Sequence, residues 1–314
     1  MPKKNPIPDM LPIRFIRKHI NQRIVRFVMY VLLLDLAFVF LFPFLYLFIT
    51  SFKSPEDLMD STVNWLISGV HIKNYMLSWE HLEYPSRFMS TVMVTLMCTL
   101  GHLVCCSFVG YGFARFKFRG KNALIVLLLL AIIVPPQTII TPIFIIFSRL
   151  GMTDTVLPLI LPTWLGFGLK GGLFIFIFRQ FYLSLPASLE EAACIDGCGS
   201  FSAFFKIMLP TSRSSLLVCL VLSTVWHWND YFEPGLYLNS QHKFLLPMML
   251  PRLYDLMKGS GTQLGGSAGS LDLVYTEGVA MAATVIVLLP IFLFYFFVQR
   301  KFIQGVERSG ITGE

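Results

Sequence analysis

The stretch ALIVLLLLAIIVPPQTIITPIFIIFS, residues 123–148, contains no charged residue and no histidine. A helix needs about 20 apolar residues to cross roughly 30 Å of hydrocarbon, so this stretch is long enough to span a bilayer. Unpaired backbone polar groups are too costly in lipid, which leaves a helix or a closed β-barrel. A barrel strand would alternate apolar and polar residues over about ten positions, and no such alternation is present. The stretch therefore predicts a membrane-spanning helix.

Composition places the whole chain in the membrane class. Of 314 residues, 55% are hydrophobic, 14% are charged and 30 are phenylalanine, whereas soluble domains average about 25% charged residues. So few charged side chains cannot cover the apolar core of a soluble protein, which excludes a soluble globular enzyme. The same composition excludes a disordered chain.

Five further apolar runs are similar to the first, so we predict an all-α, polytopic membrane protein with six transmembrane helices. Prolines inside the runs predict kinks or broken helices, although membrane helices also tolerate proline without such a role. The predicted spans are 27–50, 88–113, 123–147, 157–178, 213–232 and 278–299, and the prolines are Pro43, Pro135, Pro136, Pro142, Pro158, Pro162 and Pro290.

The Lys and Arg residues of the loops predict the orientation, because cytoplasmic loops are enriched in both. One set of alternating segments carries 17 of these residues and the other set carries seven. The richer set should be cytoplasmic, and the net charge of +7 then reflects membrane topology and not a nucleic-acid-binding surface. The richer set is 1–26, 114–121, 179–213 and 300–314, and the poorer set is 51–87, 148–156 and 233–277.

The chain thus divides into a cytoplasmic N-terminal segment 1–26, a six-span part 27–299 and a cytoplasmic tail 300–314. The six-span part includes a cytoplasmic loop 179–212 and an outward loop 233–277. The first apolar run is long and no small-x-small cleavage site follows it, so we expect an uncleaved first helix. None of the six cysteines lies in an outward loop. We therefore expect neither a disulfide framework nor a metal site.

The most informative loop segment is SLEEAACIDGCGSFSAFFKIMLP, residues 188–210. Ser188 followed by Glu191 fits a capping box and predicts that a helix starts there. Glu190 and Glu191 would lie in its first turn, where they complement the helix dipole. Gly197 and Gly199 predict a break.

A second helix is predicted from Ser200, with its end at Pro210. Its bulky residues recur at spacings of three and four and should share one face. Two short helices would then form a protrusion on the cytoplasmic surface, although periodicity alone leaves open an ordinary amphipathic surface helix. The residues of the expected face are Phe201, Phe204, Phe205 and Met208.

This segment resembles the permease signature of ABC importers. The signature is Glu-Ala-Ala, three residues, Gly, nine residues, Ile, one residue and Leu-Pro. Every position and gap agrees, at Glu191-Ala192-Ala193, Gly197, Ile207 and Leu209-Pro210, and Asp196 matches the common Asp-Gly variant. Four other stretches resemble the carbohydrate-type, maltose-permease-like subfamily. They are 111–120, 148–155, 228–232 and 299–313.

The resemblance implies that the protrusion docks into a cleft of a cytoplasmic ABC ATPase dimer, which uses ATP and Mg. The sequence contains no Gly-x-x-x-x-Gly-Lys-Ser/Thr motif, so the ATPase should be a separate chain, and no cofactor is expected to bind this chain directly. The resemblance also implies a second, homologous permease subunit, an extracytoplasmic solute-binding protein and a carbohydrate substrate. The ATPase-coupling residues would be Glu190, Glu191, Ala192, Ala193, Asp196, Gly197, Ile207, Leu209 and Pro210.

Ionisable residues within spans are costly and are candidates for the substrate pathway. Asp35 and Lys170 lie within predicted spans, and Asn229 and Asp230 lie at the end of one. Lys170 could instead snorkel to the interface or pair with Asp35. Asn229 and Asp230, together with Trp228, could instead mark the outer rim.

Trp164 is a further candidate for the pathway, because an aromatic ring can stack on a sugar, although packing is the more common role of a buried tryptophan. His102 is expected to make a hydrogen-bonded contact between helices. The Gly- and Ser-rich stretch 258–270 in the outward loop should be flexible, and it would either enter the binding protein or act as a linker. The tail 307–314 would touch the ATPase, as the resemblance implies.

The sequence therefore predicts a non-catalytic permease subunit of a carbohydrate importer, in the cell membrane with both termini cytoplasmic. A glycerol phosphate or another polyol-like solute remains an alternative cargo. An ion-coupled secondary transporter is a further alternative, although it would need more acidic residues within the spans. No His-Glu-x-x-His motif or paired catalytic carboxylates indicate an intramembrane enzyme.

Overall fold

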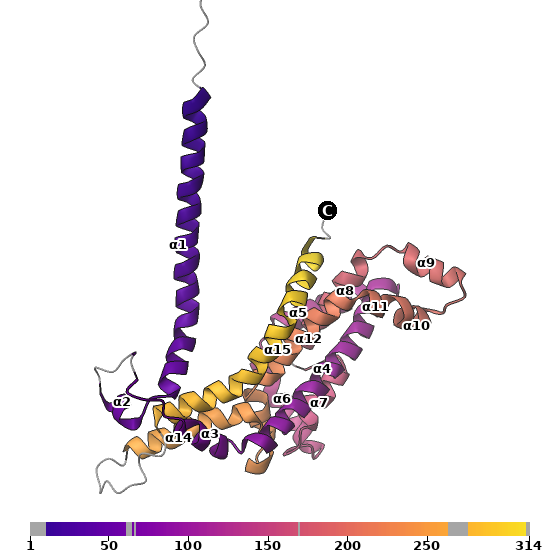
Figure 1. Cartoon of the computed structure of the whole chain (residues 1–314). Helices are drawn as coiled ribbons and strands as arrows, with labels where there is room; N and C mark the ends of the chain where they lie inside the picture. The colour runs from indigo at the N-terminus through magenta and orange to yellow at the C-terminus, as the bar shows by residue number, and fades with distance from the viewer. Residues whose placement is uncertain (1–10, 61–64, 66, 169, 263–275, 312–314) are drawn as a thin grey trace, which may run out of the picture.

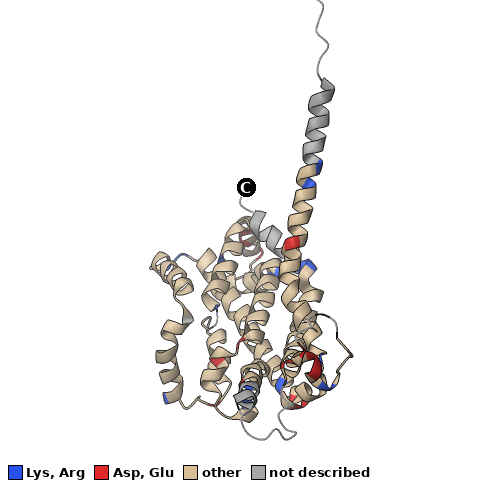
Figure 2. Ribbon diagram, turned by 90° about the vertical axis from the view of Figure 1, so that its left-hand side faces the viewer, with Lys and Arg blue, Asp and Glu red and all other residues tan. Residues whose placement is uncertain are grey.

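The computed structural model describes residues 11–60, 65, 67–168, 170–262 and 276–311. Within these residues the secondary structure is helical and contains no strand. Figure 1 shows the helices gathered into one bundle, with α1 standing beside it. Figure 2 shows that residues other than Lys, Arg, Asp and Glu form most of the visible helices, as expected for a bundle in lipid.

Three helices are long and apolar enough to cross a membrane by themselves: α1 (Leu11–Ser51), α4 (Tyr84–Arg115) and α15 (Glu277–Ile311). They contain the predicted spans 27–50 and 88–113 and the sixth predicted span. Helix α1 begins within the predicted N-terminal segment, and α15 continues into the predicted tail. The helices predicted at these three positions are confirmed.

The third predicted span is bent. Helices α5 (Lys121–Ile133) and α6 (Pro136–Arg149) meet at 103°. Val134 between them has a ψ of 122°, which is extended backbone. A residue that precedes proline is disfavoured in the helical region, so Pro135 accounts for the break. The prediction of a broken helix is confirmed at this position.

The fourth predicted span, 157–178, is also not one helix. It consists of α7 (Leu157–Trp164) and α8 (Gly171–Ser184). Gly166 and Gly168 between them have φ values of +72° and +92°, which an L-residue adopts only with strain. Two other pairs of helices, within 121–149 and 200–229, are each long and apolar enough to form one bent span. If both are counted, the described residues provide up to five candidate spans by length and composition, so the predicted number of six is not established.

The fifth predicted span, 213–232, corresponds to α12 (Arg213–Asn229), which ends three residues earlier. Short helices connect the long ones. They are α2 (Pro55–Met59), α3 (Lys73–His81), α9 (Ser188–Ile195), α10 (Ser200–Ala203), the π-helix η1 (Phe204–Met208), α11 (Leu209–Thr211), α13 (Phe232–Tyr237), the 3-10 helices η2 (Gln241–Lys243) and η3 (Leu246–Met248), and α14 (Met249–Thr262).

Helix α4 is the central element and packs against α7, α8 and α12, while α12 also packs against α15. Small residues permit this close packing. A Cβ atom on Gly110 of α4 would lie 2.7 Å from the Cβ of Phe178 in α8. In α15, Ala280 and Ala283 are fully buried. In Figure 1, α9 and the C-terminal end of α15 lie at one end of the bundle, and α2, α3 and α14 lie at the other.

Candidate coupling loop and substrate cavity

Helix α9 starts at Ser188, where the sequence predicted a helix, but not through the expected capping box. The backbone N–H of Glu191 donates to the carbonyl of Ala187 at 3.1 Å, so Ala187 is the N-cap residue and Ser188 is already the first helical residue. The capping-box assignment is therefore wrong by one residue. Glu190 and Glu191 do lie in the first turn, where a negative charge is favourable.

Helix α9 ends in a Schellman motif at the glycine of the signature. Gly197 has a φ of +80°, and the N–H of Cys198 donates to the carbonyl of Ala193 at 2.9 Å. This bond satisfies a carbonyl that the end of the helix would otherwise leave free. No atom lies within 4 Å of the position that a Cβ would take at Gly197. Glycine is therefore required here for its backbone conformation and not for lack of space.

The two faces of α9 differ in environment. Ala193 is buried and Glu190 is half-buried, so these two residues face the bundle. Ile195, 85% exposed, lies at the tip of the helix. The exposed residues between Glu191 and Gly197 form one outward surface, which we call the α9 outer face: Glu191, Ala192, Ile195, Asp196 and Gly197.

The second helix of the loop is a continuous helical run from α10 through η1 to α11. Pro210 does not end it. The run continues to Thr211, and the chain then bends by 75° into α12. Pro210 lies within this run, shortly after η1, and removes one backbone hydrogen bond there without ending the helix. The signature residues Ile207 and Leu209 are partly buried.

The expected single face of bulky residues divides in two. Phe204 and Met208 are buried, whereas Phe201 and Phe205 are 66% and 48% exposed. A π-helical turn begins at Phe204, and it departs from the regular helical period on which the prediction depended. The buried pair packs into the bundle, whereas Phe201 of the exposed pair makes only an edge contact with α4, where its ring centroid lies 5.9 Å from that of Phe108.

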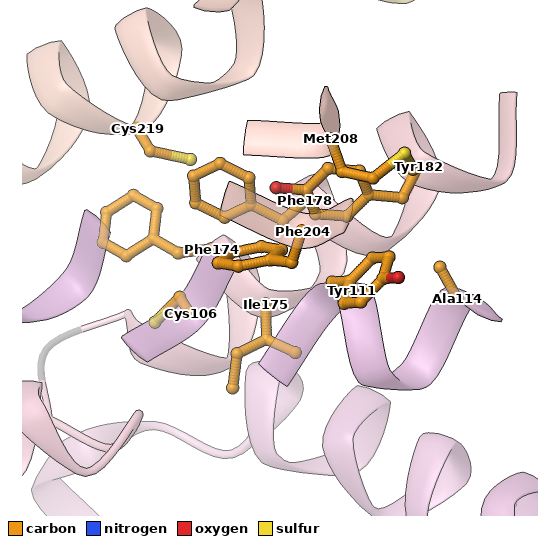
Figure 3. Packing of buried hydrophobic residues seen from close by; sticks show 10 residues of the cluster. All are labelled: Cys106, Tyr111, Ala114, Phe174, Ile175, Phe178, Tyr182, Phe204, Met208 and Cys219. Carbon is orange, nitrogen blue, oxygen red and sulfur yellow. The ribbon is translucent and has the colours of Figure 1, made fainter. Parts of the chain in front are cut away.

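Phe204 enters an aromatic cluster formed by α4, α8 and α12 (Figure 3). Its ring centroid lies 5.2 Å from that of Tyr111 and 6.5 Å from that of Tyr182. The hydroxyl of Tyr182 donates to the Oγ of Ser212 at 3.3 Å. The cluster, which we call the Phe204 cluster, comprises Cys106, Tyr111, Ala114, Phe174, Ile175, Phe178, Tyr182, Phe204, Met208 and Cys219.

An ion pair joins the loop to α4 at a second place. Arg115, the last residue of α4, contacts Glu190 of α9, and its guanidinium also donates to the carbonyl of Leu185. Nothing in the sequence singled out Arg115 as a partner of the loop, because the two residues lie far apart along the chain.

Lys170 lies at the break between α7 and α8, with a φ of 63°. Its ammonium is 5.8 Å from the centroid of the Trp226 ring, within the range of a cation–π interaction. It lines a mostly apolar cavity of about 380 Å³ between α5, α6, α7 and α8. Glu233 and Tyr237 line the same cavity.

A second cavity of about 520 Å³ is lined by Lys170, Asp230 and Glu233. The structure therefore brings together two of the predicted pathway residues, Lys170 and Asp230. Glu233 is an addition that the sequence reasoning missed, because it falls within the expected outward loop. Asp230 also stabilises the start of α13, since its Oδ1 accepts the N–H groups of Phe232 and Glu233 at 3.0 and 3.2 Å.

The other predicted pathway residues lie elsewhere. Asp35 is exposed on α1, and among the ion pairs of the described residues none joins it to Lys170. The Nδ2 of Asn229 donates to the carbonyl of Val225 within α12 at 2.8 Å. Trp164 is 42% exposed, and its Nε1 donates to the carbonyl of Met97 at 3.1 Å, which joins α7 to α4. None of the three lines either cavity.

Trp228 is buried within the bundle. It is 4% exposed, packs between α12 and α15, and donates from Nε1 to the carbonyl of Val287 at 3.1 Å. His102 is fully buried, and its Nδ1 lies 3.1 Å from the Oγ of Ser223 on α12. The prediction of a hydrogen-bonded helix contact at His102 is confirmed.

At the end of the bundle opposite α9, Asp154 joins two connections. Its carboxylate accepts hydrogen bonds from the backbone N–H groups of Asn239 and Ser240, the hydroxyl of Ser240 and the ammonium of Lys243. The Lys243 ammonium, followed by the Ser240 groups, holds the pKa of the Asp154 carboxyl well below its usual range. The turn between α6 and α7 is thereby tied to the segment that follows α13.

In the part of the chain that the structure describes, no group of three or more His, Cys, Asp or Glu residues could hold a metal ion. Cys98, Cys105, Cys106, Cys198 and Cys219 are free thiols. Most of the predicted flexible stretch 258–270 lies outside the described residues, although its first residues belong to α14.

Comparisons with known proteins point in one direction. Residues 106–308 match the model of a family described as "Binding-protein-dependent transport system inner membrane component". The chain is 29% identical over 281 residues to the arabinooligosaccharides transport system permease protein AraQ of Halalkalibacterium halodurans, covering 88% of this chain and 93% of that protein.

Two further relatives align over nearly their whole length. The polygalacturonan/rhamnogalacturonan transport system permease protein YtcP of Bacillus subtilis is 27% identical over 93% of this chain and 100% of its own. The lactose transport system permease protein LacG of Rhizobium radiobacter is 26% identical over 92% and 98%.

A solved structure supports the fold. The structure is similar, with a TM-score of 0.74 and 22% identity, to a chain of a bacterial ABC transporter involved in the import of the acidic polysaccharide alginate. The match covers 94% of this chain and 99% of that chain. At this identity the similarity shows a shared fold.

Proposed function

Because the chain belongs to the family of binding-protein-dependent transport system inner membrane components, we propose that it is one of two permease subunits of an ATP-driven importer of oligosaccharides. The chain is a multi-pass helical transport component of the inner membrane and not an enzyme. The names of its relatives, which refer to arabinooligosaccharides, lactose and polygalacturonan, support the carbohydrate cargo.

The α9 outer face is the surface through which this chain contacts the ATPase dimer. An apolar side chain at the tip, Ile195, is 85% exposed, which is unfavourable in water unless a partner covers it. Ala192 beside it is small and exposed, so a partner could approach the backbone closely. The proposal rests on one observation: Ile195 is exposed on a helix whose other side packs against the bundle.

Two attachments behind α9 transmit its movement. The Phe204 cluster joins the loop to α4, α8 and α12, and the pair of Arg115 and Glu190 joins it to the end of α4. Because close-packed side chains do not deform easily, displacement of α9 by the ATPase moves these helices together. Such a shift changes the populations of inward-open and outward-open states, while ATP and Mg stay on the partner chains.

The remaining partners follow from the same scheme. A second, homologous permease supplies the other half of the pathway, and an extracytoplasmic binding protein delivers the sugar. Both termini are cytoplasmic in this scheme. The position of the C-terminal end of α15 at the same end of the bundle as α9 supports this orientation (Figure 1).

The test is co-isolation followed by transport. The tagged chain is purified with the ATPase, the second permease and the binding protein, and uptake of radiolabelled arabinotriose and of glycerol 3-phosphate into proteoliposomes is measured with and without ATP. The proposal requires ATP-dependent uptake of the sugar. Uptake of glycerol phosphate alone would replace the cargo, and uptake driven by an ion gradient without the ATPase would contradict the proposal.

A pair of variants tests the docking surface. Ile195→Asp places a charge on the α9 outer face and should abolish co-isolation of the ATPase. Met59→Asp is the matched control, because Met59 is an apolar side chain with 79% exposure on α2, at the opposite end of the bundle. Equal ATPase recovery with both variants would exclude this face as the contact.

A further inference from the structure

The two cavities beside Lys170 contain charged groups that the coupling machinery does not use. The cavity of about 380 Å³ and the cavity of about 520 Å³ share four lining residues, Ile132, Val134, Lys170 and Glu233. Asp230 lines the larger one. Together they form one hollow region between the bent helix pair α5–α6 and the break before α8.

These charges are not neutralised by one another. Among the ion pairs that the described residues form, none includes Lys170, Asp230 or Glu233. The Oδ1 atom of Asp230 accepts two backbone N–H groups at the start of α13, and its Oδ2 atom has no hydrogen bond among those described. An ionised group in an apolar surrounding is costly unless it finds hydrogen-bonding partners. A polar solute in the cavity would provide them.

On the premise of the proposed transport function, we infer that Lys170, Asp230 and Glu233 form a subsite for the hydroxyl groups of a neutral sugar unit. Carboxylates accept hydrogen bonds from hydroxyl groups, and the ammonium donates to their oxygens. The amide of Gln137, which also lines the larger cavity, can do both. Tyr231 and Phe232 contribute aromatic side chains beside these groups, suited to the apolar face of a sugar ring.

The balance of charge selects against an acidic sugar. This chain contributes one ammonium and two carboxyl groups to the cavities, and burial raises the pKa of the Glu233 carboxyl to about 7, so near neutral pH the three groups carry no excess of positive charge. Charges are screened weakly in a cavity with apolar walls, so a uronate carboxylate would gain no net attraction from these groups and would be repelled by Asp230. The subsite therefore favours neutral oligosaccharides such as arabinotriose over acidic ones such as trigalacturonate.

Tryptophan fluorescence tests this subsite directly, since Trp226 lies 5.8 Å from the Lys170 ammonium. The assembled importer in lipid nanodiscs is titrated with arabinotriose and with trigalacturonate, and Trp226→Phe identifies the signal of Trp226. We expect a saturable change with arabinotriose and at least about tenfold weaker binding of trigalacturonate. Glu233→Gln should weaken arabinotriose binding about tenfold, the loss of one charge-assisted hydrogen bond.

Glu80→Gln on α3 is the matched control, because Glu80 is exposed and lines neither cavity. Lys170→Gln is a second test variant, to be used if Glu233→Gln assembles poorly. No saturable signal with arabinotriose, equal affinity for the two trisaccharides, or unchanged affinity in both variants overturns the subsite. ATP-dependent uptake by the same preparations reports separately on the proposed function. Coupled uptake without the expected binding rejects the subsite alone, and binding without coupled uptake rejects the transport scheme.

Discussion

The Nε atom of Arg115 lies 3.5 Å from the Oε1 atom of Glu190, and this pair connects the C-terminal end of α4 to the first turn of α9. The two side chains are 13% and 21% exposed. The Nη2 atom of Arg115 also donates to the carbonyl of Leu185 at 2.9 Å, in the segment that leads into α9. One side chain of the central helix thus holds both the start of the loop and its first helix.

Removal of this pair should uncouple ATP hydrolysis from uptake. In Arg115→Gln the carboxylate of Glu190 loses its charged partner, which costs about 1 kcal/mol, because the two atoms lie 3.5 Å apart without a hydrogen bond between them. We expect sugar uptake per ATP hydrolysed to fall about five- to tenfold in proteoliposomes, with the ATPase still bound. Arg149→Gln, at an exposed arginine at the end of α6, is the matched control.

The charge-swapped double variant, Arg115→Glu with Glu190→Arg, distinguishes a pair from two separate roles. If the two residues act on each other, the double variant should recover most of the coupling that either single change loses. Coupling in the double variant that is no better than in the worse single variant would show that the pair does not carry the movement.

Phe204 should be the main contributor to the stability of the loop. It is 2% exposed within the Phe204 cluster, and truncation of such a ring to alanine costs about 3 to 5 kcal/mol. Phe204→Ala should therefore lower the unfolding temperature in detergent clearly, whereas Phe201→Ala, at a residue 66% exposed, should change it little. Similar unfolding temperatures for the two variants would mean that the cluster does not hold the loop.

The sequence predicts the long helices well because their signal is local. Residues 84–115 and 277–304 carry enough apolar residues to identify α4 and α15 without any tertiary information. The break before α6 is visible for the same reason, because two consecutive prolines act on their own neighbours. Similarly, the Gly197 turn follows from a conformational need of that residue alone.

The features that the sequence does not reveal depend on distant partners. Trp228 was expected at an interface because tryptophan favours that position, but the carbonyl of Val287 on α15 satisfies its N–H in the core. Arg115 and Glu190 lie on different helices, and only the fold brings them together. Glu233 lines a cavity although it falls within the expected outward loop, so no local pattern indicates this position.

Gly197 should tolerate only residues that accept a left-handed backbone. A Cβ would meet no atom within 4 Å, so the cost of Gly197→Ala arises from its φ of +80°, about 1 to 2 kcal/mol. We expect α9 to lose its Schellman end and coupled uptake to fall several-fold, with partial recovery in Gly197→Asn, since asparagine accepts this conformation.

Gly199→Ala is the matched control for this change. Gly199 also has open space around its Cα, but its φ is −68°, which alanine adopts without strain. Uptake should therefore remain near the level of the unchanged protein. Equal losses in Gly197→Ala and Gly199→Ala would show that the chain needs glycine here for flexibility and not for a left-handed turn.

The Asp154 carboxylate should stabilise the end of the bundle opposite α9 in a pH-dependent way. Hydrogen bonds from Lys243 and Ser240 lower its folded-state pKa, so the contribution is fully present above the ordinary aspartate value of about 4 and is lost as the pH falls toward the lower folded value. Asp154→Asn accepts the observed φ of 58° but removes the charge. We expect Asp154→Asn to have a lower unfolding temperature than the unchanged protein at pH 7 and a difference that shrinks below about pH 4.

Asp255→Asn, at an exposed position on α14, is the matched control and should unfold as the unchanged protein does at both pH values. A pH-independent difference for Asp154→Asn would mean that the side chain acts through its shape and not through its charge.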